Sequence, residues 1–222
     1  MMARKGMSLL EMMFTVGVLL VVTSLGALLL IRTTRATLRG TMRVDMQQQA
    51  VVAMQHIFTA MRKSSCAGIS IRSGPAPRAI CVCPISQPEL RAGEPAPVQA
   101  DGVIRWSSFF LIYYYDEARQ QIRHREWPIG SVPATALETS IKGPRRLAAD
   151  RLAEVIAGTA PRESVLASGV TAFNLSYPSG GTDDLYVQPL TVQIVQERKG
   201  NTGHSKPETF TCTRSIFLAE QR

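Results

Sequence analysis

The sequence predicts an α+β protein in which one long N-terminal helix packs its second half on a mainly antiparallel β-sheet domain. Three observations lead to this prediction. Residues 12–31 carry no charge, no proline occurs before Pro75, and short strand-like runs with intervening proline and glycine follow Gly68. The length of 222 residues suits one ordinary domain with an appendage.

The uncharged run from Met12 to Ile31 predicts a membrane-spanning helix. Its 20 residues extend about 30 Å at about 1.5 Å per residue, which matches the hydrocarbon thickness of a bilayer. The chain after Ile31 is polar enough to be soluble. We therefore expect a single N-terminal membrane segment followed by a soluble domain.

An amphipathic stripe predicts that the helix continues to about Ser64. Apolar residues recur at spacings of three and four: Met42, Met46, Ala50, Ala53, Met54, Ile57 and Met61. Gly40 is the expected weak point, because glycine inside a helix costs about 1 kcal/mol relative to alanine.

Alternating and β-branched runs predict the strands of the domain. They cover residues 79–82, 103–106, 108–115, 121–127, 164–177, 186–197 and 208–218, with a turn at 116–118.

Four cysteines, Cys66, Cys81, Cys83 and Cys212, predict one or two disulfides if the domain lies outside the cytoplasm. Cys81 and Cys83 are expected to face opposite sides of a strand and to pair poorly with each other. Pairings of Cys66 and Cys212 with these two are favoured, in either of two connectivities, and free thiols are the alternative. The C-x-C spacing without a nearby histidine does not predict a zinc site.

No catalytic pattern stands out. His56, His124 and His204 are far apart in the chain, and no nucleophile-elbow, zinc-protease or P-loop motif is present. Asp183 and Asp184 fit a turn better than a calcium site. The sequence therefore predicts neither an enzyme nor a cofactor.

The net charge of +8 is spread along the chain, so nucleic acid is not an expected partner. One local cluster forms a helical stripe directly after the uncharged run: Arg32, Arg35, Arg39 and Arg43. We expect a solvated face there, with lipid headgroups or DNA phosphates as alternatives. The positive-inside rule compares the basic residues on the two sides of the membrane segment. These four arginines outnumber Arg4 and Lys5 and would place the domain in the cytoplasm, whereas the cysteines indicate the opposite orientation.

The N-terminus, RKGMSLLEMMFTVGVLLVV from Arg4 onward, resembles the type IV pilin and pseudopilin family. The resemblance implies that a prepilin peptidase cleaves after Gly6 and that Met7 becomes the N-methylated first residue. It also implies that Glu11 is the family's glutamate at the fifth mature position. The family usually has Phe where this chain has Met7. Leu28 stands where major pilins often carry proline, which favours a minor subunit.

This resemblance implies a type IV pilin-like fold divided into a leader (1–6), a membrane or filament-core half-helix (7–31), an amphipathic half-helix (32–64) and a β-rich extracytoplasmic domain (65–222). It places the leader in the cytoplasm, so that the domain lies in the periplasm. Glu11 would then pair with the amine of a neighbouring subunit, which offsets the cost of burying either charge. A secretory signal peptide cut after Gly26 is the alternative, but Glu11 would interrupt its apolar region. A plain uncleaved anchor leaves Glu11 unexplained.

Later segments, such as ESVLASGVTAFNLSY from Glu163, resemble PilW-type minor pilins and J-type pseudopilins. We expect a minor pilin in a complex that primes type IV pilus assembly and caps the tip. The alternative is a J-type minor pseudopilin of a type II secretion system. A tip adhesin or DNA-uptake receptor that uses basic loops such as Lys142–Arg146 is less favoured. The implied partners are other minor pilins, major pilin subunits, the prepilin peptidase, the inner-membrane assembly machinery and, before assembly, membrane lipid.

Overall fold

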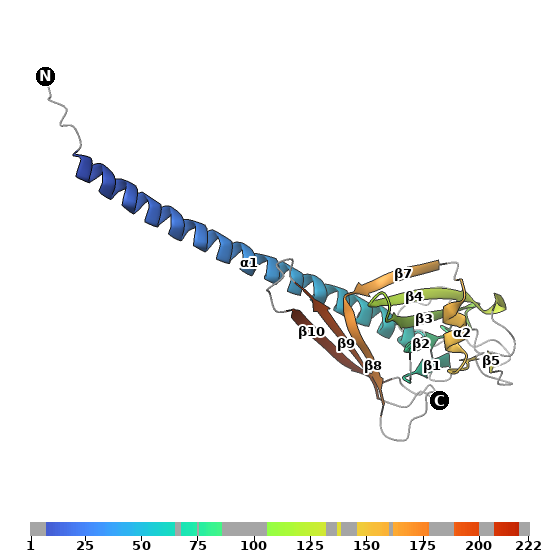
Figure 1. The fold of residues 1–222 in the computed structure, drawn as a ribbon. Helices are drawn as coiled ribbons and strands as arrows, with labels where there is room; N and C mark the ends of the chain where they lie inside the picture. Colours follow the sequence, from blue (N-terminus) through green and yellow to red (C-terminus); the bar gives the residue numbers. More distant parts are fainter. Residues whose placement is uncertain are drawn as a thin grey trace. The chain divides into compact units, whose positions relative to one another are not determined.

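The computed structural model describes residues 8–64, 68–74, 76–85, 106–131, 137–138, 146–159, 162–177, 189–199 and 207–217 (Figure 1). The helices are α1 (Leu9–Arg62) and α2 (Leu152–Ala157), with a 3₁₀ turn η2 (Ile129–Ser131). The strands are β1 (Ile69–Arg72), β2 (Ala79–Val82), β3 (Phe109–Asp116), β4 (Gln121–Pro128), β5 (Leu137–Glu138), β6 (Arg146–Leu147), β7 (Arg162–Ser168), β8 (Val170–Ser176), β9 (Leu190–Arg198) and β10 (Glu208–Ile216). The chain divides into two compact units between Val44 and Asp45.

The first unit consists of α1 up to Val44. Its side chains are exposed from Leu9 to Thr41, and Met42 is half-buried. The helix is continuous through Gly40, the expected weak point. This part of α1 therefore contributes apolar surface but no core.

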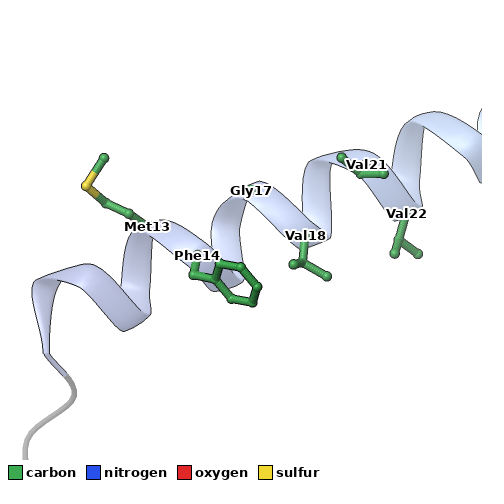
Figure 2. A pocket seen from close by; sticks show the side chains of 6 residues that line it. All are labelled: Met13, Phe14, Gly17, Val18, Val21 and Val22. Carbon is green, nitrogen blue, oxygen red and sulfur yellow. The ribbon is translucent and has the colours of Figure 1, made fainter.

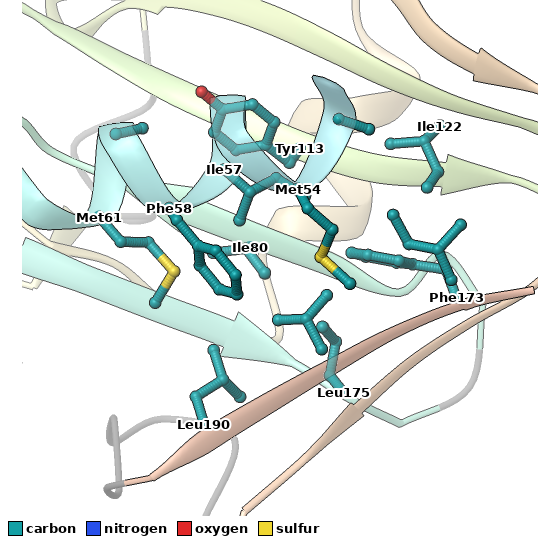
Figure 3. Packing of buried hydrophobic residues seen from close by; sticks show 14 of the residues in the cluster. Met54, Ile57, Phe58, Met61, Ile80, Tyr113, Ile122, Phe173, Leu175 and Leu190 are labelled. Atoms are coloured by element: carbon teal, nitrogen blue, oxygen red, sulfur yellow. The ribbon is translucent and has the colours of Figure 1, made fainter. Parts of the chain in front are cut away.

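The second unit is built around the last turns of α1. The predicted stripe is buried except for Met42, and Phe58 and Ala60 are buried beside it, so that the buried residues of the helix are Met46, Ala50, Ala53, Met54, Ile57, Phe58, Ala60 and Met61. From Ala50 onward they share one cluster with residues of both larger sheets, among them Ile80, Phe173 and Leu190 (Figure 3). The second half of α1 thus forms the centre of the domain core.

The larger sheet is antiparallel, with strand order β1-β2-β3-β4-β7. Its central strands are buried on both faces, since Ile80 and Val82 belong to the cluster with α1 while Ala79 and Cys81 pack with α2. The sheet therefore lies between the two helices within this unit.

The smaller sheet has the order β10-β9-β8 and is also antiparallel. Gly169, at a φ of +66°, separates β7 from β8. A left-handed conformation is easy for glycine and costly for other residues. At this residue the chain passes from the larger sheet to the smaller one.

The predicted long helix and mainly antiparallel sheet are confirmed. The single strand expected at residues 164–177 is wrong, because Gly169 divides it into β7 and β8. The short elements β1 and α2 were not predicted. Residues 103–105 and 186–188 of two expected strands lie outside the described residues, and Trp106 makes only an isolated bridge with Ile85.

Candidate functional site

Glu11 is the acidic residue in the first turn of α1. The backbone N–H of Ser8 donates a hydrogen bond to Glu11 Oε2 at 3.3 Å. A carboxylate in this turn interacts favourably with the positive end of the helix dipole. The side chain is exposed, and no ion pair of Glu11 occurs among the residues that the structure describes. The carboxylate is therefore accessible to a charge from another molecule.

The apolar run after Glu11 is exposed on every side of the helix. Phe14 and Leu30, for example, are 73% and 69% exposed. The helix is long and apolar enough to cross a membrane, and none of its most apolar window is buried. A helix that is apolar all round needs lipid or other helices around it. This indicates a single-pass membrane anchor.

Hydroxyl groups within the run bond to the helix itself. Thr15 Oγ1 donates to the carbonyl of Glu11 at 2.9 Å, and Ser24 Oγ donates to that of Leu20 at 2.6 Å. Thr23 bonds in the same way to Leu19 at 2.8 Å. Such internal bonds satisfy hydroxyl donors where no water is present. The polar residues of the run are thus compatible with hydrocarbon.

An apolar groove of about 440 Å³ lies on the helix at Gly17 (Figure 2). It is lined by Met13, Phe14, Val18, Val21 and Val22 besides the glycine. A Cβ atom added to Gly17 would meet no other atom within 4 Å. Small residues of this kind let a second helix approach closely in a membrane.

The other predicted site residues are the two at the cleavage junction and the four cysteines. Gly6, Met7 and Cys66 lie outside the described residues. Cys81, Cys83 and Cys212 are free thiols, so the structure contains none of the expected disulfides of these three. Burial raises the pKa of the Cys83 thiol to about 12, which disfavours the reactive thiolate.

The expectation that Cys81 and Cys83 face opposite sides is wrong. Residues two apart in a strand share a face, and both cysteines pack in the cluster that includes α2. Cys212 instead packs against the cluster that contains α1. The second unit thus keeps Cys212 and the other two thiols in different clusters.

A polar cluster that the sequence did not reveal connects α1 to the larger sheet. His56 Nδ1 lies 2.9 Å from the hydroxyl of Tyr113, and the His56 and His124 rings are 5.0 Å apart. His124 Nδ1 lies 3.4 Å from Ser164 Oγ. Burial, followed by the charge of His56, lowers the pKa of His124 below its ordinary value. Burial of His124 among these groups therefore favours the neutral ring.

An ionic network, also not predicted, lies between β3, β4 and β7. Glu163 accepts from Tyr114 and from Arg125 Nε, the latter at 3.0 Å, and pairs with Arg123 at 3.1 Å. Burial opposes ionisation of Glu163, but the bonds from Tyr114 and Arg125 and the arginine charges lower its pKa overall. A surface depression of about 520 Å³ beside it also contains Asp116, Glu117 and Arg119. The charges compensate one another, which fits a structural role.

Nothing in the described part of the domain forms a group of three or more metal-ligating side chains. Asp183, Asp184 and His204 lie outside that part, as do residues 142–145 of the basic loop. The strongest candidate for function is consequently the surface of α1 that begins at Glu11.

Comparison of the chain with protein-family models, with curated proteins and with solved structures finds no match in any of the three.

Proposed function

We propose that this chain is a minor pilin of a type IV pilus, part of a priming complex at the tip that initiates filament assembly. The observation that carries the proposal is the exposed carboxylate of Glu11 at the start of a helix surface that is apolar on every side. Glu11 follows the Gly6–Met7 junction at the spacing of the pilin pattern. The same helix continues into a half that its own β-rich domain buries.

The proposed role of Glu11 follows from the cost of burying charge. Cleavage after Gly6 creates a positively charged amine at Met7. In an assembled bundle of helices this amine and the Glu11 carboxylate of a neighbour would lie in an environment of low dielectric constant. Each charge alone is costly there, whereas the pair with its hydrogen bonds offsets that cost. The apolar groove at Gly17 supplies a surface for the neighbouring helix.

Before assembly the protein would reside in the inner membrane as a single-pass protein with its domain in the periplasm. Its partners would be other minor pilins, major pilin subunits, the prepilin peptidase and the assembly machinery. The second candidate within the same class is a J-type minor pseudopilin of a type II secretion system, supported by the same helix. Pilus genes or secretion genes beside the coding sequence would distinguish the two.

Co-expression with a prepilin peptidase tests the processing step. Mass spectrometry of the mature protein is expected to find N-methylated Met7 as the first residue. A Gly6→Val variant, which changes only the residue before the junction, is the matched control and should stay uncut. A mature start at Ala27, or an uncut wild-type chain, would overturn the proposal.

Substitution of Glu11 tests the assembly step separately. Glu11→Gln should still be cleaved but should lose co-purification with partner pilins, because the buried amine has no counter-charge. The matched control is Asp45→Asn, which removes the other carboxylate of α1. Loss of co-purification in the Asp45 variant but not in the Glu11 variant would exclude the proposed role of Glu11.

A further inference from the structure

Four arginines on α1 have no partner for their charge among the residues that the structure describes. They follow one another at spacings of three and four, all exposed: Arg32, Arg35, Arg39 and Arg43. Residues so spaced lie on one face of a helix. The acidic residues of α1 are Glu11 and Asp45, and Asp45 is paired with Arg198.

Like charges at these spacings destabilise a helix. The stripe therefore favours any molecule that brings negative charge to it. Arginine binds phosphate especially well, because its planar guanidinium can donate two parallel hydrogen bonds.

The position of the stripe relative to the apolar run indicates which anion it meets. Ile31 ends the run and Arg32 follows it directly. At about 1.5 Å per residue, Arg32 lies about 1.5 Å beyond Ile31 along the helix axis and Arg35 about 6 Å beyond. The corresponding values are about 12 Å for Arg39 and about 18 Å for Arg43. The headgroup layer on each side of a bilayer is only about 5–7 Å thick.

We propose that Arg32 and Arg35 bind the phosphate groups of membrane lipids, whereas Arg39 and Arg43 start from Cα atoms beyond the headgroup layer. The Cα atoms of Arg32 and Arg35 lie within the thickness of this layer, so both guanidinium groups can reach lipid phosphates. The inference rests on membrane insertion of residues 12–31 and is independent of cleavage or pilin assembly.

The test uses the full chain reconstituted into vesicles of phosphatidylcholine with one-third phosphatidylglycerol. After mild detergent extraction, native mass spectrometry measures the anionic lipid that remains bound. The variant R32Q/R35Q removes two charges, and R39Q/R43Q removes two charges from the same stripe as the matched control. Flotation of the vesicles verifies that each variant is inserted.

The expected result is that R32Q/R35Q loses bound phosphatidylglycerol by roughly 25-fold, since each of the two basic residues near an anionic surface contributes about a fivefold effect. R39Q/R43Q should change it by less than about twofold. R32K/R35K, which keeps the charge, should retain an intermediate amount and supplies the comparison if the Gln pair fails to insert.

Equal losses in the two Gln pairs would overturn the proposal and indicate a partner that covers the whole stripe, such as nucleic acid or an acidic protein. No loss in either pair would also overturn it. If R32K/R35K retains no more phosphatidylglycerol than an inserted R32Q/R35Q does, a lipid site that depends on these charges is excluded.

Discussion

The two parts of α1 differ in whether the chain itself covers their apolar side chains. Residues 12–31 are apolar around the helix and exposed, whereas residues 46–61 are apolar along one stripe that the domain buries. A one-sided stripe can be covered by the protein's own sheets. A surface that is apolar on all sides requires lipid or several other helices. The comparison teaches that the first part depends on surroundings outside the chain and the second does not.

The largest expected effect comes from truncating one apolar side chain in each part. Met54→Ala, at a residue that is 1% exposed, should lower the free energy of unfolding of the domain by about 2–5 kcal/mol because it leaves a cavity. Leu25→Ala should leave it within about 0.5 kcal/mol. Urea unfolding in detergent, followed by the fluorescence of the two tryptophans, Trp106 and Trp127, measures both. Equal destabilisation by the two variants would show that the domain depends on both parts of α1 alike.

A smaller effect is expected at Gln49, near the start of the buried part. Its Oε1 accepts from the backbone N–H and the hydroxyl of Ser168, each at 3.1 Å. Gln49→Ala leaves the Ser168 donor without this acceptor and should cost about 1–3 kcal/mol in the same unfolding assay. The matched control is Gln55→Ala, at an exposed position of the helix, which should cost less than about 0.5 kcal/mol. Similar costs for both would show that the hydrogen bonds do not stabilise the domain.

The smallest expected effect is a dependence of the domain's stability on pH. It comes from His124 of β4, whose ring lies 5.0 Å from that of His56 in the buried part of α1. The folded-state pKa of His124 lies below its unfolded value of about 6.5, so folding favours the neutral ring. Its contribution is complete above about pH 6.5 and declines as pH falls from there toward the folded pKa. His124→Gln should therefore lose less stability than the wild type between about pH 7.5 and about pH 5.5.

The groups that face His124 are His56 from α1, Tyr113 and Glu126 from the sheet, and Ser164. Unfolding curves at the two pH values measure the difference in stability for each protein. A pH dependence in His124→Gln equal to that of the wild type would assign the effect to another group.

The sequence was sufficient to predict α1 to within about two residues at each end, because the apolar run and the stripe are long and periodic. The predicted pair at residues 108–115 and 121–127 corresponds closely to β3 and β4. Glu11 stands out as the charge directly before the apolar run, and its role in assembly stays a prediction. These features depend on residues close together in the chain.

Features that depend on contacts between distant residues were missed. The six residues of α2 are too few to show a helical period. Gly169 lies in a run that otherwise looks like one strand, although a glycine there is a recognised sign of a break. The bond of Gln49 to Ser168 joins positions that only the folded domain brings together.

Gly169 has a consequence for the order of events during synthesis. By dividing the run into strands of two different sheets, it makes the core around Ile57 depend on late residues such as Ile216 of β10. Contacts between residues so far apart in the chain form slowly. The apolar run can enter a membrane as soon as it leaves the ribosome, whereas the stripe that follows remains uncovered until β8, β9 and β10 have been made. During that interval Met54 and Ile57 are apolar surface without their native cover, and such surface is prone to aggregate.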